Sequence, residues 1–354
     1  MTRGEKPPGE GACAAVREIT AILVSWEDSG ELEPAVASLA AARRIAGNSV
    51  ETSLVVVQNG GDPVREKAIL ALWPGARVLL NETNRGFGPA ANQAARQAPG
   101  DVLLFLNPDA RAEGDSFSEI ARGLGDRPEA AALAPRLIDR ETPEKGREGR
   151  RLSPPDREDQ FTFQLRRLPG LLADARELLL VDHLFPNNPW RRSFRYADRD
   201  RESAFEVEQP AAAVLAVRTA AFWRAGGFDE AFVPAWFEDV DLCERLRREG
   251  AILYWPHARF RHRGGVSAAR LGYPRFLPLY YGNALLYRKK HYGMPARLAY
   301  RALLSAGMML RLSALPFRPV VPRSRGEAAR AYLSTLRLAL QPATGNLRRA
   351  RSPF

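Results

Sequence analysis

The N-terminal third of the chain alternates strand-like and helix-like runs, and this alternation constrains the fold more than any other feature. Short apolar runs rich in Val, Ile and Leu are separated by longer segments with helical spacing. The predicted order is strand 19–26, helix 31–46, strand 53–58, helix 64–73, strand 77–81, helix 89–97 and strand 101–106. Strands and helices in this order form a parallel sheet covered on both faces. We therefore predict an α/β fold with a Rossmann-like, mostly parallel central sheet flanked by helices.

Composition and cysteine usage narrow the class of protein. The 354 residues are 45% hydrophobic and 26% charged, as in an ordinary globular chain. The two cysteines, Cys13 and Cys243, are too few for a disulfide framework or a cysteine metal site, which favours a reducing cytoplasm. Residues 1–17 lack the apolar core of a signal peptide, so we expect a disordered leader there. No apolar run is long enough to predict a membrane span.

Positive charge is concentrated at the C-terminus. The formal net charge is +11, yet residues 270–354 hold 16 Lys and Arg against one acid, Glu327. Within this region, residues 298–317 have the composition of an amphipathic helix that could lie on anionic lipid or pack against its own domain. Nucleic acid is disfavoured as a partner because aromatic residues are not interleaved with the basic ones. We expect residues 293–354 to form a basic helical extension.

Polar side chains follow the predicted strands at the edge where parallel sheets bind ligands. They are Glu27, Asp28, Gln58, Asn59, Asn84, Asn107 and Asp109. The chain contains neither GxGxxG nor a GxxxxGK phosphate loop, so dinucleotide and P-loop sites lose their main support. We therefore predict a single ligand cleft at the carboxyl ends of the strands.

Three carboxylates, Glu238, Asp239 and Asp241, open a predicted amphipathic helix. The positive end of the helix dipole favours ionised carboxylates, and so favours a base over an acid. A short strand at 251–255 should follow, closed by Pro256.

A histidine, His262, is expected in the loop after that strand. Together with Asp109 and two phosphate oxygens it would form an oxygen-rich site suited to Mn²⁺ or Mg²⁺. The flanking Arg261 and Arg263 could bind diphosphate instead, and both possibilities stay open.

Five motifs occur in an order that is typical of one family. They are NETNRGFGPAANQA, LLFLNPDA, GGFDE, FEDVDLC and HRGGVS. In this order they resemble the inverting GT-A fold glycosyltransferases of family 2, especially the rhamnosyltransferase-like branch that builds bacterial surface polysaccharides. The resemblance covers roughly residues 19–292. It implies a GT-A domain over 18–292, with a nucleotide-sugar-binding half at 18–110 and an acceptor and catalytic half at 207–292.

The resemblance also implies roles for particular residues. Asp239 corresponds to the general base, and Asp109 and His262 correspond to metal ligands. The implied donor-binding residues are Trp26, Glu27, Gln58, Asn59, Arg85, Gly86, Asn92, Asn107 and Asp109. The implied acceptor-binding residues are Trp236, Glu238 and Asp241.

The chain departs from the family's pattern in its nucleotide loops. Gln58 replaces the Asp that pairs with N3–H of a uracil or thymine ring, and a glutamine oxygen accepts that hydrogen bond more weakly because it is uncharged. Asn107 replaces the first Asp of the DxD-like motif, and Glu27 stands where Asn is common. The choice of nucleotide is therefore open.

The expected reaction is a single displacement with inversion. A sugar, with rhamnose as one candidate, would move from a dTDP- or UDP-sugar to a saccharide or lipid-linked acceptor in bacterial surface polysaccharide synthesis. The expected location is the cytoplasm or the inner face of the cytoplasmic membrane. Two alternatives remain: an inactive carbohydrate-binding protein at the membrane surface, and a sugar nucleotidyltransferase.

Residues 136–206 are charged and Pro-rich, then aromatic and basic. This composition is typical of a mobile insert over a cleft, and we expect an acceptor-side lid. A tolerated surface insertion is equally consistent with it.

Overall fold

The computed structural model describes residues 15–26, 30–60, 64–139, 160–264, 271–317 and 324–341. The predicted Glu27 and Asp28, most of the leader and part of the insert lie outside these ranges. Within the leader, Val16 is buried in the core and the Arg17 amide donates to Asp101 Oδ2 at 2.9 Å. Residues 16 and 17 thus already pack on the domain, before the predicted start at residue 18.

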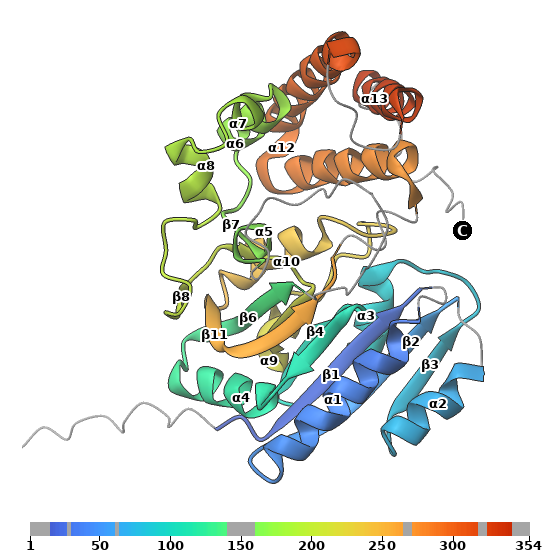
Figure 1. The fold of residues 1–354 in the computed structure, drawn as a ribbon, viewed down its shortest axis with the longest axis vertical. Coiled ribbons are helices and arrows are strands. Elements are labelled where there is room, and N and C mark those ends of the chain that lie inside the picture. Colours follow the sequence, from blue (N-terminus) through green and yellow to red (C-terminus); the bar gives the residue numbers. More distant parts are fainter. Residues whose placement is uncertain are drawn as a thin grey trace, which may run out of the picture.

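A nine-stranded sheet forms the centre of the molecule (Figure 1). Its parallel part consists of β3 (Arg77–Asn81), β2 (Glu51–Asn59), β1 (Glu18–Ser25) and β4 (Val102–Leu106), in that order. The order continues through β10 (Val214–Arg218), β6 (Ala130–Asp139), β11 (Ala251–His262) and β5 (Ala110–Glu113), with β8 (Phe205–Glu206) on β11. Only β10, β5 and β8 run antiparallel to their neighbours. The predicted α/β class with a mostly parallel sheet is confirmed.

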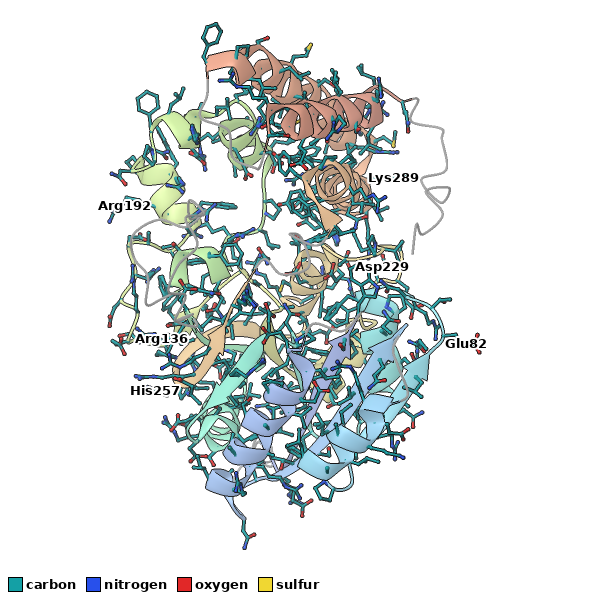
Figure 2. The ribbon with its side chains drawn as sticks, turned by 45° about the vertical axis from the view of Figure 1, so that its right-hand side comes forward. Glu82, Arg136, Arg192, Asp229, His257 and Lys289 are labelled. Atoms are coloured by element: carbon teal, nitrogen blue, oxygen red, sulfur yellow. The ribbon has the colours of Figure 1, made fainter. Side chains whose placement is uncertain are left out.

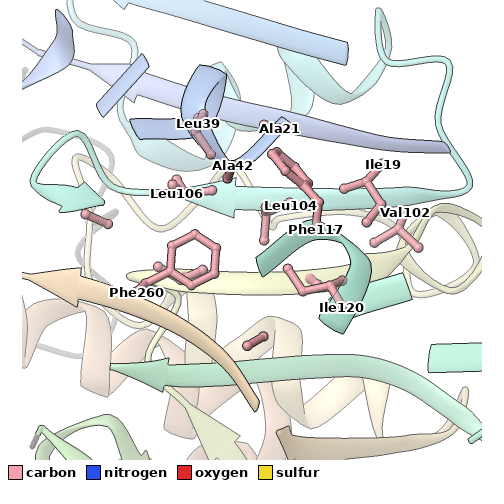
Figure 3. Close-up of a cluster of buried hydrophobic side chains, with 14 of the residues drawn as sticks. Ile19, Ala21, Leu39, Ala42, Val102, Leu104, Leu106, Phe117, Ile120 and Phe260 are labelled. Carbon is pink, nitrogen blue, oxygen red and sulfur yellow. The ribbon is translucent and has the colours of Figure 1, made fainter. Parts of the chain in front are cut away.

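Helices cover both faces of this sheet. α1 (Leu32–Ala46) and α4 (Ser116–Asp126) pack on one face, where Leu39, Phe117 and Ile120 meet side chains of β1 and β4 (Figure 3). α3 (Phe87–Ala95), α9 (Thr219–Arg224) and α10 (Glu238–Leu246) pack on the other. α2 (Val64–Leu72) lies beside α1. Because both faces are covered, the central strands are apolar on both sides, as their continuous Val, Ile and Leu runs require.

The strand β11 is longer than the sequence indicates. It continues past Pro256 to His262, so His262 ends a strand and does not lie in a loop as predicted. The pairing of β11 with β6 shifts register between Trp255 and Arg259. Pro256 falls inside this irregularity, where its missing N–H breaks no ladder hydrogen bond.

The described part of the insert folds into short elements. They are α5 (Phe161–Gln164), β7 (Leu165–Arg166), α6 (Leu171–Leu178), α7 (Val181–Leu184) and α8 (Pro189–Phe194), with β7 paired to β9 (Gln209–Pro210). In Figure 1 these elements lie along the left side of the molecule, with α6, α7 and α8 beside the C-terminal helices, and α6 contacts α12.

The C-terminal region is helical, as predicted. α12 (Tyr273–Ala314) is interrupted at Gly293, whose φ of 79° lies outside the helical region, and its two parts point in different directions (Figure 1). A short 3₁₀ turn, η1 (Leu315–Phe317), leads towards α13 (Arg325–Leu340). Leu304 and Met308 of the second part are buried with Ala331 and Ala339 of α13, so one face of the predicted amphipathic helix packs against its own domain. Among the described residues, no helix is both long and apolar enough to cross a membrane.

Candidate active site

A cavity of about 780 Å³ lies between the carboxyl ends of the strands and the C-terminal helices. A volume of this size is typical of a site for a small-molecule ligand. It gathers most of the site residues predicted from sequence: Trp26, Asn59, Asn107, Asp109, Trp236, Glu238, Asp239 and His262. The strand ends, the start of α10 and the end of β11 therefore converge on one place, as expected.

Asp109 and His262 form a buried pair at one side of the cavity. Nε2 of His262 lies 3.3 Å from Oδ1 of Asp109, and among the described residues it has no hydrogen-bond partner. Nδ1 of His262 lies 2.8 Å from Oε1 of Gln160. Because an amide oxygen only accepts, Nδ1 carries the hydrogen and Nε2 is the nitrogen that faces the carboxylate. A histidine oriented in this way by a neighbouring amide is typical of a metal ligand.

The Asp109 carboxyl is held in its ionised form. Burial acts to raise its pKa, but the approach of His262, at 3.3 Å, and hydrogen bonds from backbone amides together outweigh burial and lower the pKa. The Gly264 amide adds a hydrogen bond to Oδ2 at 3.2 Å. The short turn after β4 and the end of β11 are thus joined around one carboxylate.

Two protein ligands do not make a complete metal cage. No group of three or more His, Cys, Asp or Glu side chains that could hold a metal occurs among the residues the structure describes. The pair does fit a hard divalent cation that takes its remaining ligands from diphosphate oxygens and water, as Mg²⁺ and Mn²⁺ sites do.

Glu238 and Asp239 stand side by side at the start of α10, on the cavity wall. Burial raises the pKa of both carboxyls, and the charge of Asp239 raises the pKa of Glu238 further. Asp239 accepts hydrogen bonds from the amides of Val240 at 2.8 Å and Ala212 at 3.3 Å, whereas Glu238 Oε2 is buried without a partner among the described residues. When one proton is shared, Glu238 therefore holds it and Asp239 carries the charge.

The segment before α10 has an unusual backbone. Trp236 and Phe237 both have positive φ values, 72° and 70°, in a region that bulky side chains rarely adopt. Asn283 of α12 holds the segment by donating to the carbonyls of Ala235 and Trp236, both at 3.0 Å. The Trp236 ring also packs edge-on against Phe276 of α12, with ring centroids 4.8 Å apart. Strain at such positions persists only where the surroundings fix it, and here α12 fixes Trp236 beside the two carboxylates.

Asn59 joins the end of β2 to the NETNRGFGPAANQA motif through hydrogen bonds. Asn59 donates to Asn84 Oδ1 at 2.8 Å and to the Gly86 carbonyl at 3.1 Å, and it accepts from Asn81 and from the Arg85 amide. Although Asn59 lines the cavity, its amide is fully used.

Several predicted binding residues lie away from the cavity lining. Asn92 bonds Phe228 and Glu230 of the GGFDE turn. Asp241 is paired with Arg245, Lys290 and His291, so the structure places it between α10 and α12 and not in the predicted acceptor site. Arg85 is exposed, and Gly86 packs against Pro234 and Val233. These residues position the walls of the site.

Gln58 is a separate case. Its side chain is 1% exposed, and among the described residues neither its amide oxygen nor its amide nitrogen has a partner. It does not line the cavity itself but precedes Asn59, which does. Buried polar atoms without partners are costly, and at a binding site they are commonly paired by the ligand.

The alternative diphosphate ligands, Arg261 and Arg263, lie outside the cavity lining. Arg261 forms an ion pair with Glu113 at the edge of the sheet, and Arg263 Nη1 lies 3.3 Å from Glu31. Glu31 also pairs with Arg111. Their neighbour His262 is the residue that faces Asp109.

The insert that was expected over the cleft lines one wall of the cavity, and α12 lines a part that sequence reasoning did not predict. The insert contributes Arg166, Arg167, Phe194 and Arg195, and α12 contributes a row of aromatic and apolar side chains: Tyr273, Phe276, Leu277, Tyr280 and Tyr281. Gln160, which orients His262, was missed as well. The only signal for the insert wall was its aromatic and basic composition.

Comparisons with known proteins show which family model and which curated enzyme this chain resembles. Residues 20–175 match the model of Glycosyl transferase family 2. The chain is 27% identical over 261 residues to the N-acetylglucosaminyl-diphospho-decaprenol L-rhamnosyltransferase of Mycobacterium tuberculosis (strain ATCC 25618 / H37Rv), an alignment that covers 70% of this chain and 77% of the relative. 

Solved structures give more distant matches. The mannosyltransferase PcManGT from Pyrobaculum calidifontis, in complex with GDP-Man and Mn²⁺, is 13% identical with a TM-score of 0.47 over 95% of this chain and 89% of its own. GalNAc-T7 with UDP, GalNAc and Mn²⁺ is also 13% identical, with a TM-score of 0.47. The match covers 79% of this chain and 52% of that protein. From the family match over residues 20–175, the similarity to the mycobacterial enzyme and the residues around the cavity, we conclude that this chain is a glycosyltransferase.

Proposed function

We propose that this protein transfers a sugar, with inversion, from a nucleoside-diphosphate donor to a lipid-linked saccharide. The observation that carries the proposal is that Asp239 and the Asp109–His262 pair line the same cavity. One carboxylate suited to accept a proton and one suited to hold a cation are the two groups that such a displacement needs.

Asp239 would act as the general base. It takes the proton of the acceptor hydroxyl as that oxygen attacks the anomeric carbon, while the bond from this carbon to the diphosphate oxygen breaks on the opposite face. The hydrogen bonds from Val240 and Ala212 hold the carboxylate in place. Its raised pKa makes it a better proton acceptor than an exposed aspartate. Glu238, in its protonated form, can donate a hydrogen bond to the acceptor.

Asp109 and His262 would hold Mn²⁺ or Mg²⁺ together with the donor diphosphate. When bound, the cation supplies positive charge that stabilises the leaving nucleoside diphosphate. The buried, unpartnered Nε2 of His262 and the ionised Asp109 carboxyl support this assignment.

The donor is proposed to be a dTDP- or UDP-sugar, with rhamnose as the candidate sugar. The mycobacterial relative is named as a rhamnosyltransferase that acts on a diphospho-decaprenol acceptor, and this supports a rhamnosyl donor and a lipid-linked acceptor here. Such an acceptor is consistent with a role in the synthesis of cell-surface polysaccharide.

We further propose that the C-terminal region rests on the inner face of the cytoplasmic membrane. Although one face of α12 and α13 is used in packing, apolar side chains remain exposed on these helices and at η1: Leu298, Met309, Leu310, Phe317, Leu333 and Leu340. The strong excess of Lys and Arg in this region would add attraction to anionic lipid. Sedimentation with vesicles of anionic or neutral lipid tests this, and binding that is independent of lipid charge would contradict the electrostatic part.

Nucleotide release from a panel of dTDP-, UDP- and GDP-sugars, with and without Mn²⁺ or Mg²⁺, tests the function. We expect one donor to be used in a metal-dependent reaction that is lost in Asp239→Asn and Asp109→Ala. No release from any donor, even with lipid-linked acceptors added, would instead support a carbohydrate-binding protein without activity.

A further inference from the structure

Two arginines on the insert wall of the cavity have no acidic partner. Arg166 ends β7, and Arg195 directly follows α8. Both line the cavity, and no described carboxylate forms an ion pair with either guanidinium. Nη1 of Arg195 donates to the Thr162 carbonyl at 3.2 Å, and Arg166 lies over the Phe163 ring, 5.4 Å from its centroid. Nε of Arg166 is buried without a partner among the described residues.

The other two arginines that line the cavity are engaged. Arg167 pairs with Glu208 at 3.0 Å. Arg311 donates to the carbonyls of Leu178, Gly307 and Glu177. Arg166 and Arg195 are thus the two cavity arginines whose charge no described carboxylate or set of carbonyls balances.

The two charges are close enough to act on each other. Burial, followed by the charges of Arg166 and Arg191, lowers the pKa of Arg195 to about 10. The acids that oppose this effect are Glu177 and Asp182, and neither is ion-paired with Arg195. Like charges partly removed from water without a counterion favour the binding of an anion.

The two arginines line the same cavity as Asp239. Arg166 acts electrostatically on Asp239, the proposed base, whereas the groups that act on Asp109 are His262 and backbone amides. The same wall continues into the aromatic and apolar side chains of α12, including Phe276, Leu277 and Tyr280. An anion bound here would therefore have the base on one side and an apolar surface on the other.

We propose that Arg166 and Arg195 bind the diphosphate of a lipid-linked acceptor. The sugar of such an acceptor then faces Asp239, and the start of its hydrocarbon chain lies along α12. Two guanidiniums match the two phosphates of the linkage, since each can make paired hydrogen bonds to phosphate oxygens. This inference rests on the proposed function and adds to it the chemical group by which the acceptor is recognised.

Two matched acceptors test the proposal kinetically. Both carry the same sugar and the same lipid chain, but one is linked through a diphosphate and the other is an uncharged alkyl glycoside. In Arg166→Gln and Arg195→Gln we expect the KM for the diphosphate acceptor to rise roughly 10- to 100-fold, the size expected for lost hydrogen bonds to a charged group. The KM for the neutral acceptor and for the donor should stay within about twofold, and lysine variants should recover part of the loss.

Arg192→Gln is the matched control. Arg192 lies on α8, is exposed and points away from the body of the molecule (Figure 2). The Arg192→Gln substitution therefore removes the same charge at a position outside the cavity. It should leave the KM for both acceptors unchanged. An equal loss with both acceptors in the cavity variants would mean that the arginines only support the fold. A rise in donor KM alone would assign them to the donor, and either result overturns the proposal.

A binding measurement separates this inference from the proposed function. In EDTA, which removes divalent cations from the donor side, titration calorimetry with farnesyl diphosphate should show binding to the wild-type protein and to Arg192→Gln. The Arg166→Gln/Arg195→Gln double variant should not bind. Equal binding by the double variant, or none by the wild type, overturns the inference whether or not a donor is turned over.

Discussion

At the scale of single residues, the two carboxyls of α10 have different roles despite being adjacent. Asp239 accepts two backbone hydrogen bonds and carries the charge, whereas Glu238 is buried and keeps the shared proton. We expect Asp239→Asn to lower kcat by about 10²- to 10⁴-fold, the usual contribution of a general base. Glu238→Gln, which imitates the protonated form, should lose far less. Steady-state rates of both variants check this, and equal losses would contradict the division of roles.

The raised pKa of Asp239 has a consequence for the pH profile. The base must be ionised, so activity should fall as the pH drops through its pKa. Because burial raises that pKa, the fall should lie at higher pH than the ordinary aspartate value of about 3.9. In Arg166→Gln the fall should move to still higher pH, since the charge of Arg166 lowers this pKa. Profiles of kcat/KM between pH 4 and 9 measure both effects, and a profile that Arg166→Gln does not move would contradict the electrostatic link.

Replacing Gln58 should change the stability of the protein and its donor binding in opposite directions. Its buried amide has no partner in the described part of the chain, so replacing it with leucine removes polar atoms that are costly to bury. We expect Gln58→Leu to raise the free energy of unfolding by about 1 kcal/mol or more without ligand. If the nucleotide base pairs with this amide, donor KM should rise at the same time. Thermal unfolding together with donor kinetics checks both, and a variant with unchanged donor KM would place the base elsewhere.

At the scale of elements, the sequence predicted the strands and helices of the N-terminal third to within about two residues. Here β1 and β4 are buried on both faces and α1 buries one apolar face, so the local pattern and the packing agree. The predicted end of β11, at residue 255, was wrong because a bulge accommodates Pro256. Such a bulge depends on the partner strand, which the local sequence does not indicate.

The insert could not be predicted in the same way. Its helix α6 is held by contacts to α12, which is distant in sequence, and the composition of the insert resembles that of a loop. Because contacts distant in sequence cannot be read locally, site residues could be predicted only where they follow a strand or open an amphipathic helix. Asp109 and Asp239 were predicted and line the cavity, whereas Arg166, Arg195 and Gln160 were not predicted. The prediction for Asp241 failed because its ion pairs come from α12, at residues 290 and 291.

The segment before α10 also depends on α12. Asn283 donates to the carbonyls of Ala235 and Trp236, which hold two positive-φ residues in place. We expect Asn283→Leu to destabilise the fold by about 1–3 kcal/mol, because these carbonyls lose their partner. It should also raise acceptor KM by freeing Trp236. Chemical denaturation and acceptor kinetics measure these two effects, and normal acceptor KM would mean that the backbone holds Trp236 without help.

At the scale of the whole molecule, a buried ion pair joins the insert to the C-terminal helices. Arg288 of α12 is 2% exposed and pairs with Asp174 of α6. Asp174→Ala leaves this guanidinium buried without its counterion, so we expect a loss of about 3–5 kcal/mol in unfolding free energy. The exposed pair Arg224–Glu249 is the control, and Glu249→Ala should cost less than about 1 kcal/mol. Similar losses in both variants would show that the interface does not depend on this pair.

The internal hydrogen bonds of Asn59 and Asn92 have one more consequence. Asn59 bonds Asn84 and Gly86, and Asn92 bonds Phe228 and Glu230, so both side-chain amides are used inside the protein. They have no group left to distinguish one sugar or nucleotide from another. Substitutions that change the donor or the acceptor are therefore expected at the strand ends, the insert and α12, whose side chains line the cavity.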